Sequence, residues 1–434
     1  MFRHLSSASL CALLIASPAA SAPAANAQPA SPPAASPSPG QAHLSLGEAL
    51  ARAAATDPSV MAAAARLDAA EAAVRQAGVK PTPSLGLEVE NFTGSGPYSR
   101  LGRTEATLSY ERALERGGKR EARTGRARAE LQVVRLRAQA ERLDSLRDVQ
   151  VAYAEALAAE AELLVAEARL VSAHRSQSHI ARRVRSARDP LFAGSRAEAL
   201  TAQAEIARDR AREAARTARA HLASYWGGSV DFSLTLDDFF NVTPPADLPE
   251  ASAIDLELLD AEREVAMAAV RLEQARGVPD PTLRGGVRYL GDGSDVALVV
   301  GGSIPLGAAR ANRANVDRAQ AERAAAEQDV AVARAVRGRE IVRLTARLRA
   351  LALESERIRA EVIPHAIRTV EQVTAGFNRG GFAYLDVTEA ERALTEARGR
   401  RVELLRDYHN ILAALDRLTG KHRPLLTTLP EERR

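Results

Sequence analysis

The sequence predicts a mainly α-helical chain that also contributes strands to a membrane β-barrel. Three observations predict this fold: long Ala-rich, charged segments with helical periodicity, pairs of short alternating segments between them, and a similarity between the two halves of the chain. We expect two helix, strand, strand, helix repeats, at residues 44–228 and 251–420. An inter-repeat segment at 229–250 joins them, and residues 421–434 form a C-terminal tail.

The longest predicted helix runs from Gly118 to Ala187, about 70 residues, or on the order of 100 Å. It carries a seven-residue ladder of apolar residues, interrupted once by Gln150, which is typical of a coiled-coil seam. The ladder consists of Leu136, Leu143, Leu157, Leu164 and Val171. After the breakers Asp189 and Pro190 a partner helix folds back as a hairpin.

The second half repeats this scheme. Helices are predicted over 307–375 and 384–418, with a break at 378–381. Residues 269–288 resemble residues 71–90: in both, a helix end is followed by two prolines and an alternating segment. A duplicated unit implies the same order of helices and strands in both halves.

Four short segments alternate between apolar and polar residues, as membrane barrel strands do. They lie near 85–89, 106–110, 283–289 and 296–304. Four strands cannot close a barrel, and open sheet edges are not tolerated in lipid. Several chains must therefore share one barrel, and three chains would supply about twelve strands. The alternative is a soluble, sandwich-like cap on a coiled coil.

The N-terminus has the pattern of an export signal. Arg3 supplies a positive start, residues 10–15 are apolar, and residues 25–27 offer a small-x-small cleavage site. The apolar stretch is far shorter than the roughly 20 residues that span a bilayer. We therefore expect a cleaved signal peptide at 1–27 and a disordered Pro/Ala/Ser leader at 28–43.

Composition argues against several kinds of site. The only cysteine, Cys11, lies in the signal peptide, so no thiol remains for a disulfide, a thiolate metal site or a nucleophile. The 59 basic and 55 acidic residues are mixed, so no nucleic-acid-binding face is predicted. No catalytic motif or metal-ligand spacing is present, and His174 and His179 are expected on different helix faces. We expect no enzyme activity, no cofactor and no metal ligand.

Several motifs, in this order and spacing, resemble the TolC-type outer-membrane efflux proteins over essentially the whole mature chain, and within them the heavy-metal (CzcC-like) branch. They are LSLGEALARAAATDPSV at 44–60, Pro-Thr-Pro at 81–83, ENFTGSG at 90–96, ERGGKR at 115–120 and the stretch 381–394 with its LDVTEAERAL core. One departure is that Arg112 and Ala113 stand where the branch commonly has Gln-Pro.

The resemblance implies an assembly and its partners. Three chains would form one twelve-stranded barrel in the outer membrane lipid of a Gram-negative bacterium, continued by a long periplasmic helical tunnel. Residues 229–250 and the tail would form an equatorial belt around it. The homotrimer would conduct substrate passively, with heavy-metal cations as the expected substrate, from an inner-membrane RND-type pump and a periplasmic adaptor protein.

The resemblance also implies a site at the periplasmic tip of the second hairpin. Asp386 and Glu389 match the acids that constrict the pore, and in a trimer they would ring the axis with carboxylates. The tip itself would comprise Phe377, Arg379, Gly380 and Phe382. The Tyr and Arg that lock such pores fall on the two phenylalanines, so that lock is absent, and Arg379 is a candidate replacement.

The tip of the first hairpin is crowded with basic residues: Arg182, Arg183, Arg185 and Arg188. They are candidates for docking the adaptor, and the alternative is an ordinary solvated charge run. Two other functions stay open at this point. One is a drug-efflux or type I secretion duct, and the other is a periplasmic coiled-coil structural protein that does not conduct.

Overall fold

The computed structural model describes residues 42–99, 101–251 and 253–426. The predicted signal peptide, most of the leader and the end of the tail lie outside these residues. Ala42 and His43, which we assigned to the leader, form strand β1 (Ala42–His43), which pairs in parallel with β4 (Phe232–Ser233). No helix in the described part of the chain is long and apolar enough to cross a membrane.

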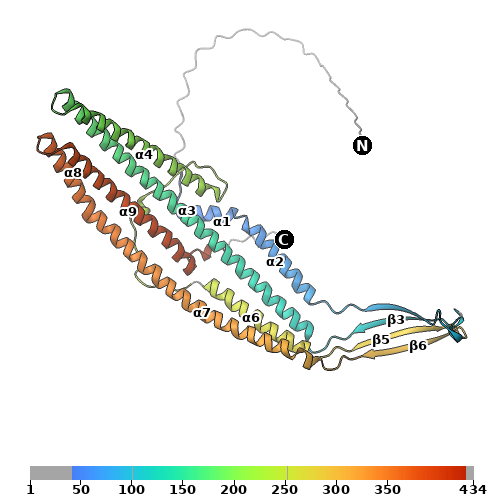
Figure 1. Cartoon of the computed structure of the whole chain (residues 1–434). Coiled ribbons are helices and arrows are strands. Elements are labelled where there is room, and N and C mark those ends of the chain that lie inside the picture. Colours follow the sequence, from blue (N-terminus) through green and yellow to red (C-terminus); the bar gives the residue numbers. More distant parts are fainter. Residues whose placement is uncertain (1–41, 100, 252, 427–434) are drawn as a thin grey trace, which may run out of the picture. The chain divides into compact units, whose positions relative to one another are not determined.

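Long helices dominate the described chain (Figure 1). The helices of the first half are α1 (Leu46–Thr56), α2 (Ser59–Ala77), α3 (Lys119–Arg185) and α4 (Leu191–Ser224). Between the halves lies the short helix α5 (Asp237–Phe240). The helices of the second half are α6 (Ala253–Arg276), α7 (Ala308–Arg357), α8 (Ile363–Asn378) and α9 (Tyr384–Thr419). Short 3-10 turns are Gly96–Tyr98, Leu101–Arg103 and Arg423–Leu426.

The helix predicted over 307–375 is observed as continuous helical structure from Ala308 to Asn378, with one local departure from α-helical geometry. A π-helical turn, Ile358–Val362, separates α7 from α8, and Ile363 N–H bonds to the Ile358 carbonyl across this wider turn. Pro364 lies in the first turn of α8, where its missing N–H and fixed φ do least harm.

The predicted seam of α3 is buried over its first part only. Leu136, Leu143 and Leu157 are buried, whereas Leu164 and Val171 are about half exposed in the single chain. The interruption at Gln150 is a buried polar contact, because its Nε2 donates to Asp416 Oδ2 of α9 at 2.9 Å. A buried amide that is hydrogen-bonded in this way costs little and fixes the register of the two helices.

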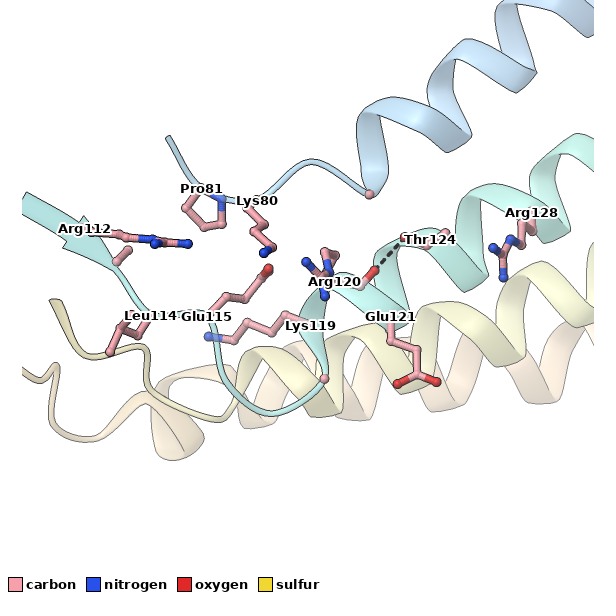
Figure 2. A pocket seen from close by; sticks show the side chains of 13 residues that line it. Lys80, Pro81, Arg112, Leu114, Glu115, Lys119, Arg120, Glu121, Thr124 and Arg128 are labelled. Atoms are coloured by element: carbon pink, nitrogen blue, oxygen red, sulfur yellow. Dashed lines mark hydrogen bonds between the residues drawn. The ribbon is translucent and has the colours of Figure 1, made fainter. Parts of the chain in front are cut away.

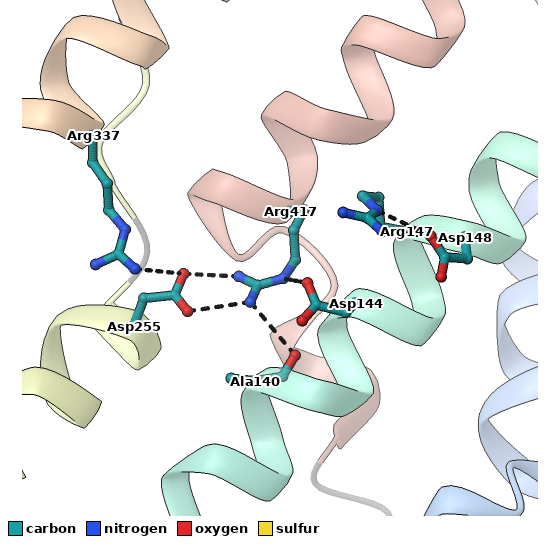
Figure 3. A network of polar contacts seen from close by, with 7 residues as sticks. All are labelled: Ala140, Asp144, Arg147, Asp148, Asp255, Arg337 and Arg417. Atoms are coloured by element: carbon teal, nitrogen blue, oxygen red, sulfur yellow. Dashed lines mark hydrogen bonds and ion pairs between the residues drawn. The ribbon is translucent and has the colours of Figure 1, made fainter. Parts of the chain in front are cut away.

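A partly buried ion-pair network joins four helices (Figure 3). The Arg417 guanidinium of α9 donates to both carboxylate oxygens of Asp255 of α6, at 2.8 and 3.1 Å, and to Asp144 of α3 at 2.6 Å. Arg337 of α7 lies 3.6 Å from the same Asp255 carboxylate. Removing one partner of a buried pair leaves an uncompensated charge, which typically costs about 3–5 kcal/mol.

The four predicted strands form one antiparallel sheet in the order β2-β3-β5-β6. Their bounds are Ser84–Glu90 for β2, Glu105–Ala113 for β3, Thr282–Leu290 for β5 and Asp295–Ser303 for β6. Within the described residues, β2 and β6 each pair on one side only. The sheet therefore has two open edges in the single chain.

The two faces of this sheet differ in chemistry. One face carries exposed apolar side chains in register across the strands, as in the row Leu87, Leu108, Val287 and Leu298. The other face is polar and internally paired: Arg288 reaches both Glu90 and Glu105 at 3.2 and 3.0 Å and donates to Thr107 at 2.8 Å. Alternation along each strand produces this segregation.

Candidate functional site

The ends of the two hairpins pack together through a small apolar cluster. Ile180 of α3, Ala193 and Ala197 of α4, Phe377 of α8 and Val387 of α9 are all buried in it. All four helices of the two hairpins contribute, so the tips form one structural unit. This unit, the hairpin-tip cluster, holds the predicted site residues of both repeats in one place.

Arg183 connects the two tips. Its guanidinium forms a two-pronged ion pair with Asp189, at 2.7 and 3.1 Å, and donates to the Phe377 carbonyl at 3.3 Å. The hydrogen bond with Asp189 raises the pKa of Arg183. Arg183 was predicted as an adaptor contact, but its side chain is used inside the molecule, where planar bidentate geometry suits Arg better than Lys.

The other three arginines of that tip, Arg182, Arg185 and Arg188, are exposed. In the described residues none of the three has a carboxylate within ion-pair distance. All three therefore stay predicted as adaptor contacts, with an ordinary solvated charge run as the alternative.

Both hairpins turn by the same backbone motif. At the end of α3, Arg188 N–H bonds to the Arg183 carbonyl at 2.9 Å; at the end of α8, Gly381 N–H bonds to the Gly376 carbonyl at 2.9 Å. The motif places one residue in the left-handed region, which favours glycine. Gly380 (φ +86°) meets this need in the second tip, whereas Ala187 (φ +56°) fills the position in the first.

The two predicted tip phenylalanines differ in environment. Phe377 is buried, whereas Phe382 is half exposed and its ring lies against Gly376, where no space is left for a side chain. Arg379 follows the end of α8 and is exposed, and its side chain has no hydrogen-bond or ion-pair partner among the described residues. The single chain therefore leaves Arg379 available, as its predicted role as a replacement lock requires.

The predicted constriction acids lie in the first turns of α9 and are both exposed. Asp386 Oδ2 accepts a hydrogen bond from the backbone N–H of Ala383 at 2.8 Å, so its carboxylate caps the helix. Glu389 instead pairs with Arg392 at 2.8 Å. The two carboxylates thus differ in how much of their charge is compensated within the chain.

A groove of about 720 Å³ runs between α3 and the α8–α9 hairpin at these tips. We call it the tip groove. Glu391 lies in it and accepts hydrogen bonds from Ser172 and Ser176 of α3, at 2.7 and 3.0 Å. Both His174 and His179 line it as well. Their contacts agree with the prediction of different helix faces, because His174 lies 3.9 Å from Glu205 of α4 and His179 lies 3.3 Å from Asn378 of α8. Among the described residues, no group of three or more His, Cys, Asp or Glu is placed to hold a metal ion.

Sequence reasoning missed the tip groove and its carboxylate. Ser172 and Ser176 are four residues apart and so lie on one face of α3, which was the available signal. Their partner Glu391 is 219 residues from Ser172 in the sequence. Burial, reinforced by the charge of Glu391, raises the pKa of Tyr384, which also lines the groove.

The arrangement of long helices, a small sheet and paired hairpin tips has a counterpart among known families. A family model described as "Outer membrane efflux protein" matches residues 49–228 and 250–421. The chain belongs to the outer membrane efflux protein family. The TolC-type resemblance noted from the sequence is confirmed, and the family and fold are those of outer-membrane efflux channels.

Individual relatives of this efflux protein agree. It is 26% identical to the cobalt-zinc-cadmium resistance protein CzcC of Cupriavidus metallidurans, over 87% of this chain and 90% of that protein. The fold is similar to the outer membrane protein VceC of Vibrio cholerae (TM-score 0.67, 22% identity, 86% of this chain and 96% of that one). It is also similar to a membrane protein of Pseudomonas aeruginosa (TM-score 0.70, 19% identity, 86% of this chain and 90% of that one).

Proposed function

We propose that three copies of this efflux protein form one passive duct across the outer membrane. Each chain would supply its four strands to a twelve-stranded barrel, and the hairpins would line a periplasmic tunnel. The observation that carries this proposal is the sheet itself, which combines two unpaired edges with one exposed apolar face. Pairing β6 of one chain with β2 of the next removes every open edge, which lipid requires.

The apolar face is the surface that would meet the acyl chains. Leu298 and Val300 of β6 are 83% and 87% exposed, a surface that water disfavours and that lipid accepts. The polar face, with its Arg288 ion pairs, would then line the water-filled interior, as in known membrane barrels. The exposed C-terminal part of the α3 seam, at Leu164 and Val171, would be covered by a neighbouring chain.

The repeat organisation belongs to the same proposal. Residues 44–228 and 251–420 would each contribute one hairpin and one strand pair, with 229–250 in an equatorial belt. The periplasmic adaptor would meet the exposed arginines Arg182, Arg185 and Arg188, and an inner-membrane RND-type pump would supply the driving force.

Heavy-metal cations are the substrate that we propose. The support is the similarity to a protein named for cobalt, zinc and cadmium resistance, together with the acids at the second tip. In a trimer, Asp386 and Glu389 would place six carboxylates around the axis and favour cations. Asp386 would contribute more, because in the described chain it has no cationic partner whereas Glu389 is paired with Arg392.

Ion selectivity tests the acid ring. Asp386→Asn keeps an oxygen for the cap at Ala383 but removes the charge, so reversal potentials under a salt gradient should move towards non-selectivity. Glu389→Gln should act in the same direction by a smaller amount, and block by multivalent cations should weaken in both. Glu403→Gln, an exposed acid further along α9 that pairs with Arg400, is the control. Unchanged reversal potentials in both variants would sink the assignment.

A deletion strain tests the substrate. Loss of the gene should raise sensitivity to cobalt, zinc or cadmium salts, and the wild-type gene should restore resistance. Increased sensitivity to organic drugs alone, or loss of a secreted protein, would instead support a drug-efflux or type I secretion duct.

A further inference from the structure

A cationic pocket lies where the sheet meets the helices, far along the chain from the hairpin tips. It has a volume of about 540 Å³ and is formed by the segment between α2 and β2 and the segment between β3 and α3. Figure 2 shows the side chains of Lys80, from the segment between α2 and β2, Arg112, near the end of β3, and Arg120, in the first turn of α3, converging on it. We call these three residues the basic triad.

The charge of the basic triad is not neutralised within the described chain. Lys119 also lines the pocket but pairs with Asp280 at 2.7 Å, and Glu115 is paired with Arg123. Glu121 points away from the triad in Figure 2. Lys80, Arg112 and Arg120 are exposed, and no ion pair joins any of them to a carboxylate of the described residues. Arg128, which lines the pocket further along α3, is likewise exposed and unpaired, so the pocket holds four cations without acidic partners among the described residues.

The pocket continues the apolar face of the sheet. Arg112 alternates with Glu111 along β3 and so lies on the same face as Tyr110 and Leu108, each 50% exposed. Leu114, which also lines the pocket, is 38% exposed. An apolar strip that ends in a cluster of cations matches a ligand with an acyl chain at one end and an anion at the other.

We propose that the basic triad binds the phosphate of an anionic phospholipid, with its acyl chains along Leu108 and Tyr110. This inference rests on the proposed barrel, which places the helix end of the sheet at the level of the lipid head groups. Arg guanidinium and Lys ammonium groups are the usual partners of phosphate oxygens. An anionic head group is favoured over a zwitterionic one because it brings no ammonium group of its own among three cations.

Lipid binding to the purified trimer tests the proposal. The trimer in neutral detergent is titrated with phosphatidylglycerol or phosphatidylcholine, and bound lipid is counted by native mass spectrometry. The wild type should prefer phosphatidylglycerol, and the triple variant Lys80→Gln, Arg112→Gln, Arg120→Gln should bind it about tenfold more weakly. The matched control removes three unpaired cations at the tip, by Arg182→Gln, Arg185→Gln and Arg188→Gln, and should bind like the wild type.

Three outcomes would overturn the inference. Equal binding of both lipids by the wild type, or equal loss in the triad and control variants, removes the specific site. Displacement of the lipid by millimolar inorganic phosphate would show a simple anion site. Conduction is measured on the same sample. If the trimer conducts but shows no lipid preference, only the proposed lipid site is refuted. If it binds phosphatidylglycerol selectively but does not conduct, only the proposed channel function is refuted.

Discussion

The guanidinium of Arg183 lies over the ring of Phe377, 4.4 Å from its centroid. Arg183 lies in the last turn of α3 in one hairpin and Phe377 in the last turn of α8 in the other, so this stacking contact fastens the two tips together. It adds to the hydrogen bond from Arg183 to the Phe377 carbonyl. If the two hairpin tips move relative to each other, this contact must break; if it stays intact, the two tips move together.

Loss of the Arg183 side chain should loosen the first tip. Arg183→Gln removes a cation–π contact worth about 0.5–1 kcal/mol and a partly buried ion pair of similar value. Amide hydrogen exchange in the turn at 186–190 should accelerate roughly tenfold, since about 1.4 kcal/mol corresponds to a factor of ten. Arg182→Gln, which removes a neighbouring exposed charge, should leave exchange unchanged. Equal acceleration in both variants would mean that the contact does not hold the tip.

Exchanging Ala and Gly at the two hairpin turns should change the stability of the two tips in opposite directions. Ala187 adopts φ +56°, a left-handed conformation that disfavours a Cβ, so Ala187→Gly should stabilise the first tip by about 0.5–1 kcal/mol. Gly380→Ala should destabilise the second tip by a similar amount, because Gly380 has φ +86°. Exchange protection at each turn measures both, and effects of the same sign would contradict the shared turn motif.

Stability should fall at mildly acidic pH because of His409. Its ring stacks on Phe239, with centroids 5.2 Å apart, and its Nε2 lies 3.2 Å from the Phe239 carbonyl. Burial lowers the pKa of His409, and burial likewise lowers that of His422. As pH falls below about 6.5, these histidines therefore become protonated in the unfolded chain before they do so in the folded one. The free energy of unfolding is highest above that pH and decreases as pH falls towards the lower pKa of the folded state.

The variant His409→Phe measures this contribution, because it keeps the stacking but cannot titrate. The drop in apparent unfolding temperature between pH 7.5 and 5.5 should be roughly halved, with His422 supplying the rest. His365→Gln removes an exposed histidine and should leave the drop unchanged. If the unfolding temperature of His409→Phe decreased as much as that of the wild type, the pH dependence would arise from other groups.

Opposite faces of β6 should respond differently to charge. Leu298 lies on the apolar face opposite Val287, and Val299 lies on the polar face opposite Gly286. Leu298→Arg should reduce assembly into the outer membrane, since Arg on the lipid face costs roughly 2–4 kcal/mol near the midplane. Val299→Arg, with the same added charge, should still assemble. The yield of membrane-extracted trimer measures this, and the reverse order would place the wrong face in lipid.

Local signals in the sequence were sufficient to predict individual elements. The expected helix over 118–187 is observed as Lys119–Arg185. Gly118, with φ +70°, directly precedes it and Pro190 directly precedes α4, and both residues restrict the backbone at their own positions. Alternation predicted the four strands and their faces for the same reason. Pro364 was one exception, since its effect is absorbed by a π-helical turn that has no sequence signature of its own, and strand β1 within the expected leader was another.

Contacts between distant residues were not predictable in this way. Arg417 and Asp255 are 162 residues apart, and Arg183 and Phe377 are 194 apart. Such pairs depend on how the long helices are aligned against one another, which periodicity within one helix does not determine. For that reason Arg183 was placed with the exposed arginines, and Glu391 of the tip groove was not identified.

Single-channel recording in a planar bilayer tests the central claim most directly. Trimer verified by native mass spectrometry and added to the bilayer should produce discrete current steps. Leu298→Arg protein should produce few insertions under the same conditions. A wild-type trimer of confirmed mass that never conducts, at any voltage or salt concentration that the bilayer withstands, would contradict the channel and favour a structural coiled coil.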